Sequence, residues 1–181
     1  MMHPPTIGRG AITKRAANFS DLAYLMVEPG NKSQKIARIE DQLEERGYGN
    51  WKVVRPRSNR DVLTLQDESG KRHVAYRGTD TSGKATGRDL WNDANLAVGR
   101  QTKDYKKRVQ FGRQAGADSA SGHSLGGALA KSAGARGRVD TFNSAKMPGM
   151  PGVAGDVVEH RTRGDVVSML NPGKQKTKKR I

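Results

Sequence analysis

Apolar residues at helical spacing predict one long amphipathic helix in the first third of the chain. Over residues 33–46, Ile36, Ile39 and Leu43 share one face, and charged residues occupy the opposite face. Gly47 follows this pattern directly and is typical of a helix C-terminus. We therefore expect a helix over 33–46 that buries one apolar stripe.

Two other segments are predicted to be helical. Residues 103–115 have a weaker pattern, in which Tyr105 and Val109 face inward. Asp21–Val27 is predicted to form a short helix whose N-cap is Ser20. We expect both helices to cover a sheet.

Short runs of β-branched and aromatic residues predict strands. They are Trp51–Val54, Val62–Leu65, His73–Tyr76, Val139–Phe142 and Val157–Thr162. A turn at 68–70 joins the second run to the third as a hairpin-like pair. Strands that alternate with helices indicate an α/β sheet with parallel members.

The composition limits the class of protein. A chain of 181 residues suits one domain. It has no cysteine, which excludes disulfides and thiol chemistry. It also lacks a signal-peptide pattern and an apolar run of about 18 residues. We expect a soluble protein that no signal peptide secretes, either cytoplasmic or associated with a virion.

Positive charge is concentrated at the two ends of the chain. The net charge is +15, and residues 1–18 and 171–181 carry eight basic side chains and no acidic one. We expect flexible basic arms at 1–18 and 171–181 around a folded domain at 19–170. Such arms attract anionic membranes, acidic proteins or nucleic acids, although plain solubility also explains them.

The strongest chemical signal is the sequence GHSLG at residues 122–126. It matches the G-x-S-x-G nucleophile elbow, a turn between strand and helix that exposes a serine, here Ser124. The turn has no room for side chains at Gly122 and Gly126. The following helix stabilises negative charge, and the backbone N–H of Leu125 is one oxyanion donor. The alternative is a glycine-rich turn before a helix.

The extended sequence GHSLGGALA, at 122–130, resembles the elbow of class 3 lipases. Further segments are similar to that family in the right order. Residues 74–79 resemble its strand followed by RGT, and 89–93 resemble its D-W-x-x-D segment. Residues 141–144 lie where the strand after the elbow helix ends, and 163–167 then resemble the acid loop. Residues 58–61 also resemble short lipase-like proteins encoded by large DNA viruses.

The resemblance implies a compact α/β-hydrolase fold, a sheet flanked by helices. It implies that Thr79 supplies the second oxyanion N–H and that Asp165 is the triad acid. The expected substrate is a carboxylic ester, including that of a phospholipid. We expect no cofactor and no metal, because the chain lacks cysteine and paired histidine spacing.

The histidines depart from the family pattern, because none follows Asp165. A serine triad needs an imidazole to accept the serine proton. His160, on the strand that leads to Asp165, is the best candidate base. His123 belongs to the elbow and is interpreted as structural, and His73 as a sheet residue. His3 lies in the N-terminal arm, where nothing positions it.

Two further departures concern polarity. The loop at 81–87 is too short and polar to act as the amphipathic lid of an interfacial lipase. The strand expected before the elbow, 116–121, is far more polar than a central strand usually is.

Two functions therefore stay open. The first is a lipase or esterase with a degenerate triad, in which Ser124 attacks, Asp165 and His160 assist, and Thr79 and Leu125 hold the oxyanion. The second is a catalytically silent hydrolase fold with a structural or interaction role. It would resemble a minor capsid or virion component whose basic tails contact neighbouring subunits.

Overall fold

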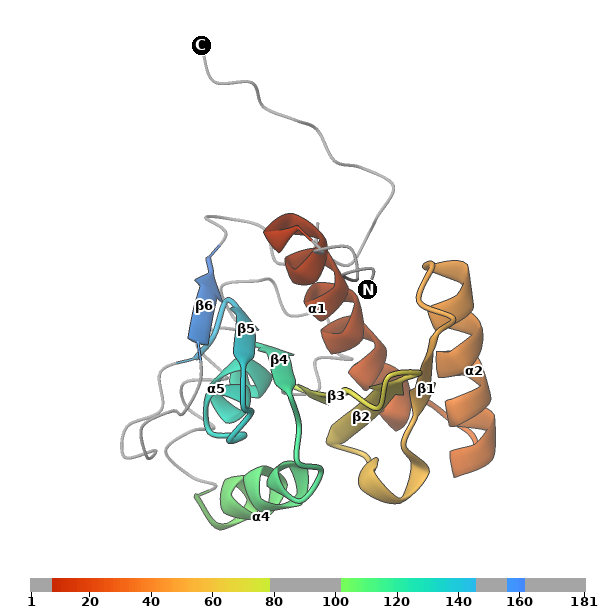
Figure 1. The fold of residues 1–181 in the computed structure, drawn as a ribbon. Coiled ribbons are helices and arrows are strands. Elements are labelled where there is room, and N and C mark those ends of the chain that lie inside the picture. The colour runs from red at the N-terminus through yellow and green to blue at the C-terminus, as the bar shows by residue number, and fades with distance from the viewer. Residues whose placement is uncertain (1–7, 79–101, 146–155, 162–181) are drawn as a thin grey trace.

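A mixed six-stranded sheet forms the centre of the computed structural model, which describes residues 8–78, 102–145 and 156–161. The strand order in this part of the chain follows the sequence (Figure 1). The strands are β1 (Trp51–Val53), β2 (Val62–Asp67), β3 (Arg72–Tyr76), β4 (Ser119–His123), β5 (Arg138–Phe142) and β6 (Asp156–His160). β1 to β3 pair antiparallel, and β3 to β6 pair parallel. This topology confirms an α/β fold with parallel members.

Helices cover both faces of the sheet. Those in the described residues are α1 (Arg9–Leu22), α2 (Lys32–Glu45), α4 (Thr102–Arg113) and α5 (Leu125–Lys131), with 3-10 turns η1 (Ala23–Val27) and η2 (Arg55–Arg57). One core cluster joins α1, η1 and α2 to β1–β3, and the other joins α4 and α5 to β2–β5. None of these helices is long and apolar enough to span a membrane.

Helix α2 confirms the amphipathic prediction. Ile36, Ile39 and Leu43 are its buried residues, and Ile39 and Leu43 pack in the core cluster that includes β1–β3. The helix begins after Asn31, whose side chain accepts a hydrogen bond from the backbone N–H of Gln34. The Gln34 side chain accepts one from the N–H of Asn31 in return, which completes a capping box.

The predicted hairpin is formed by β2 and β3, which pair with Val62 opposite Tyr76. The Asp67 carboxylate accepts hydrogen bonds from the backbone N–H groups of Ser69 and Lys71. Gly70 has a φ of +84°, a conformation that only glycine adopts without strain. The turn therefore has the residue types that its geometry requires.

The prediction of a flexible arm at 1–18 is wrong for its second half, and so is the helix start at Ser20. Residues 9–18 lie in α1, which continues to Leu22, so Ser20 is in a helix interior. Ala16 and Phe19 are buried against the sheet. The inward face of α1 mixes alanine, serine and threonine with few large apolar residues, and this face lacks the periodicity of α2.

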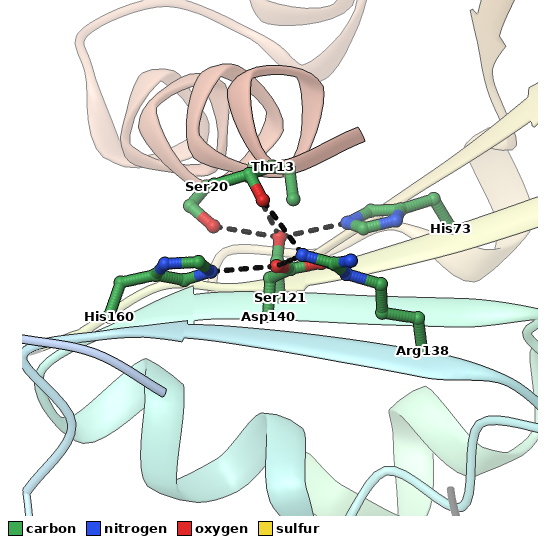
Figure 2. A network of polar contacts seen from close by, with 8 residues as sticks. Thr13, Ser20, His73, Ser121, Arg138, Asp140 and His160 are labelled. Carbon is green, nitrogen blue, oxygen red and sulfur yellow. Dashed lines mark hydrogen bonds and ion pairs between the residues drawn. The ribbon is translucent and has the colours of Figure 1, made fainter. Parts of the chain in front are cut away.

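A buried polar layer connects α1 to the sheet (Figure 2). The Ser121 hydroxyl donates to the carbonyl of Ala16 at 3.1 Å and accepts from the Ser20 hydroxyl at 2.7 Å. The ring of His73 bridges Ser121, 2.8 Å from Nε2, and Ser119, 2.8 Å from Nδ1. The polarity of β4 thus has a structural reason, because each of these buried groups has a partner.

The layer holds its histidine in the neutral form. Burial, and then the positive charge of Arg15, lower the pKa of His73 to about 3. Since the Ser121 proton is donated to Ala16, His73 Nε2 is the donor toward Ser121 and Nδ1 accepts from Ser119.

We predict that acid weakens the fold through His73. Between the ordinary histidine pKa near 6.5 and the native value near 3, the unfolded chain binds more protons than the folded protein. In that window the free energy of unfolding therefore decreases as the pH is lowered. From pH 7 to pH 5 the loss from His73 is about 2 kcal/mol. Urea unfolding at both pH values measures it. The variant His73→Gln should lose less between the two pH values; an unchanged difference would contradict the assignment.

Candidate active site

The chain turns sharply at Ser124, between the end of β4 and the start of α5. Ser124 has φ 50° and ψ −120°, in a region that non-glycine residues rarely occupy. Its N–H donates to the carbonyl of Phe142 at 2.9 Å, and its carbonyl accepts from Gly127 at 3.1 Å and from Ala145 at 3.1 Å. These bonds hold a half-buried serine at the tip of a strand-turn-helix unit, as the G-x-S-x-G pattern predicts.

The glycines on either side of Ser124 allow backbone segments to touch. A Cβ on Gly122 would lie 2.3 Å from the carbonyl carbon of Gly126. A Cβ on Gly126 would lie 2.2 Å from the carbonyl oxygen of Tyr76. No side chain fits at either position, so α5 packs directly on β3 and β4.

The end of β3 meets the same turn. A Cβ on Gly78 would lie 2.8 Å from the carbonyl oxygen of His123 and 2.6 Å from the hydroxyl oxygen of Tyr24. The first turn of α5 begins at Leu125, and backbone N–H groups in a first turn have no acceptor inside their own helix. Gly78 therefore brings its segment, and the Tyr24 hydroxyl, next to the elbow.

A buried arginine fixes the end of β3. Arg77 is 4% exposed, and its guanidinium contacts the carboxylate of Asp61 at 2.7 Å. Arg108 contacts the same carboxylate at 3.4 Å. Sequence reasoning missed this pair, although the hairpin register could have found it: Val62 opposite Tyr76 places Asp61 opposite Arg77.

Three stacked rings follow the elbow across the sheet. The ring of Phe142 lies between that of His123, 5.1 Å away, and that of His160, 4.9 Å away. Burial lowers the pKa of His123 to about 4. Its Nε2 lies 3.9 Å from a carboxylate oxygen of Asp21 on α1. This packed, neutral ring agrees with the interpretation of His123 as structural.

His160 contacts an acid other than the expected one. Its Nε2 lies 2.8 Å from Oδ1 of Asp140 on β5 (Figure 2). Arg138 binds both oxygens of Asp140, at 2.7 and 2.8 Å, and also donates to Thr13 on α1. Burial by itself raises the pKa of Asp140, but hydrogen bonds from Arg138 and His160 outweigh it and hold the pKa below its ordinary value. The carboxylate is therefore ionised.

The structure brings together part of the predicted site. Ser124, Leu125, Gly122 and Gly126 form the elbow. Thr79, Asp165 and the segments at 81–93 and 163–167 lie outside the described residues. Within the described part, no three acidic or histidine side chains are grouped so that they could hold a metal ion.

A model of the phospholipase-like family, described as the Tle-like phospholipase domain, matches residues 15–172. The match includes α1 from Arg15 onward, the whole sheet and the elbow. No curated protein and no solved structure matches the chain.

We predict that the elbow glycines are required for folding. Gly122→Ala and Gly126→Ala should each destabilise the protein by about 3 kcal/mol, because the new Cβ would overlap backbone atoms. Gly10→Ala is the matched control, since Gly10 lies in α1 with nothing within 4 Å of its Cβ position. It should stabilise the helix by about 0.5–1 kcal/mol. Urea unfolding compares the three variants, and equal effects would contradict the close approach.

Proposed function

Because the chain belongs to the Tle-like phospholipase family, we propose that it is a serine hydrolase that cleaves carboxylic esters of phospholipids. The backbone of Ser124 carries this proposal. A residue held at φ 50° costs about 1–3 kcal/mol, and such strain is concentrated at functional sites. The membership itself indicates lipase-like or phospholipase-like activity and a lipid ester substrate.

In the proposed reaction the Ser124 oxygen attacks the ester carbonyl carbon and passes its proton to a base. The carbonyl electron pair moves to the carbonyl oxygen, and the N–H of Leu125 stabilises the resulting oxyanion. Thr79 is proposed as the second donor, a role that the packing of its neighbour Gly78 on the elbow supports. The alcohol then leaves with the proton, and water releases the acyl group from Ser124.

We assign the base to His160. It is the histidine among the described residues that has a carboxylate at hydrogen-bond distance, 2.8 Å from Asp140. Because Nε2 faces Asp140, the proton of Ser124 would go to Nδ1. Asp140 would then orient the ring and stabilise its charged form, the role that the lipase resemblance assigns to Asp165.

The same pair favours a second candidate function. Asp140 also binds Arg138, and the His160 ring stacks on Phe142. The contact between His160 and Asp140 can therefore have a purely structural role. The chain would then be a silent hydrolase fold with an interaction role, such as a virion component. In that case the basic segments at 1–18 and 171–181 would contact polyanions.

We predict that a fluorophosphonate probe labels Ser124 and that the protein hydrolyses a short-chain p-nitrophenyl ester. Ser124→Ala should abolish labelling and lower turnover by roughly 10⁴-fold, because the nucleophile is lost. Ser132→Ala is the matched control. Ser132 lies at the other end of α5 and is 2% exposed. If folded wild-type protein is not labelled, the result would support the catalytically silent hydrolase fold.

We predict that His160→Gln lowers the rate of Ser124 labelling by about 100-fold, the contribution of a general base. The pH profile of the remaining rate should also change, because the group that accepts the Ser124 proton is lost. Asp140→Asn should reproduce part of the loss.

A structural role would give a different result. The variants would then lower the free energy of unfolding and leave the labelling rate of folded protein, and its pH profile, unchanged. Labelling and urea unfolding of each variant, measured on the same sample, separate the two roles.

A further inference from the structure

The surface has a hollow of about 420 Å³. Its walls come from η1, the start of α2 and the segment that precedes β2. The described residues that line it are Met26, Val27, Lys32, Lys35, Asn59 and Arg60. Three of these six side chains are cations, and none is acidic.

The positive charge of the hollow lacks compensation within the described residues. None of Lys32, Lys35 and Arg60 forms an ion pair with a described acidic side chain. The nearby acids have other partners: Asp61 binds Arg77 and Arg108. The Lys32 amine donates to the carbonyl of Ser58 at 2.7 Å, which holds it in place. Cations gathered in a concave site repel one another, and an anion relieves that repulsion.

Contacts along the chain connect the hollow to the elbow. The carbonyl of Arg60 accepts a hydrogen bond from Nε of Arg77 at 3.3 Å, and Arg77 directly precedes Gly78. On the opposite wall, Met26 and Val27 belong to η1, the turn that also contains Tyr24. Since the Tyr24 hydroxyl lies beside Gly78, both walls contact residues 77–78, the segment that follows β3 and packs on the elbow.

The hollow has an apolar side as well as a charged side. Val27 presents aliphatic surface next to the three cations, and Met26, which is 4% exposed, also lines this side. Asn59 uses its side-chain oxygen for the backbone N–H groups of Asp61 and Val62, so its NH₂ group is the end that can donate to a ligand. This combination suits an anion attached to an apolar group.

We propose that this hollow binds the phosphate of a phospholipid headgroup while an ester bond of the same lipid lies at Ser124. This inference rests on the proposed function, because it assigns a subsite to the same reaction. Lys35 and Arg60 neutralise the phosphodiester, Asn59 donates a hydrogen bond to it, and Val27 contacts the glycerol. Anionic phospholipids are therefore preferred over uncharged esters.

Binding is tested first, on full-length Ser124→Ala protein, so that no lipid is consumed. Vesicles of phosphatidylcholine with phosphatidylglycerol should bind this protein. The double variant Lys35→Gln/Arg60→Gln should bind them about ten-fold more weakly, because each cation near an anionic surface contributes to affinity. The control Lys106→Gln/Lys107→Gln removes equal charge from exposed positions of α4 and should lose far less. Equal losses in both double variants would overturn the proposal.

Two further experiments identify the ligand and separate this inference from the proposed function. Glycerophosphoglycerol should shift the NMR signals of Asn59 and Arg60, and inorganic phosphate should do so more weakly; a response to inorganic phosphate alone would overturn a headgroup site. With Ser124 intact, the turnover lost by Lys35→Gln/Arg60→Gln should be about ten-fold larger on phosphatidylglycerol than on the uncharged p-nitrophenyl ester. An inactive wild type that still binds through Lys35 and Arg60 would reject the hydrolase but retain the pocket.

Discussion

The direct backbone contact between α5 and the ends of β3 and β4 is the constraint on which the rest of the site depends. A Cβ on Gly126 would lie 2.2 Å from the Tyr76 carbonyl, and one on Gly122 would lie 2.3 Å from Gly126. Because no side chain separates these segments, the turn between them must be tight, and Ser124 occupies it with a positive φ. Gly78 joins the same contact, so the serine and the end of β3 keep their relative position as long as the core is intact.

The polar layer under α1 determines how that helix lies on the sheet. Apolar contacts are non-directional and would tolerate several helix orientations. The Ser121 hydroxyl accepts hydrogen bonds from Ser20 and His73 and donates one to the carbonyl of Ala16. These bonds are directional, and a buried hydroxyl without its partner costs about 1–3 kcal/mol. The layer therefore selects one register for α1. Since η1 continues from α1, the same bonds set the position of Tyr24 beside the elbow.

Features that depend on neighbouring residues could be predicted from the sequence, and features that depend on distant partners could not. The helix at 33–46 and the elbow at 122–126 each have their signal within one short segment. Ser20 resembles an N-cap locally, but its partner is Ser121, 101 positions away. The contact of His160 with Asp140 is similar, because it arises from the register of β5 against β6. The strand before the elbow looked too polar for the same reason: its partner, His73, lies on another strand.

Arg77, which follows β3, and the cations of the hollow affect binding and chemistry in different ways. Arg77 forms an ion pair with Asp61, whereas Lys35 and Arg60 have no ion pair among the described residues. Near the elbow, positive charge favours the negative charge that develops on an ester oxygen. A phosphate bound by Lys35 and Arg60 would cancel much of that field before the reaction begins. In the proposed site these two cations therefore act mainly by retaining an anionic lipid, and they add little to the attack by Ser124. Lys35 and Arg60 would then lower KM for anionic lipids relative to uncharged ones, while kcat would depend on the elbow and its base.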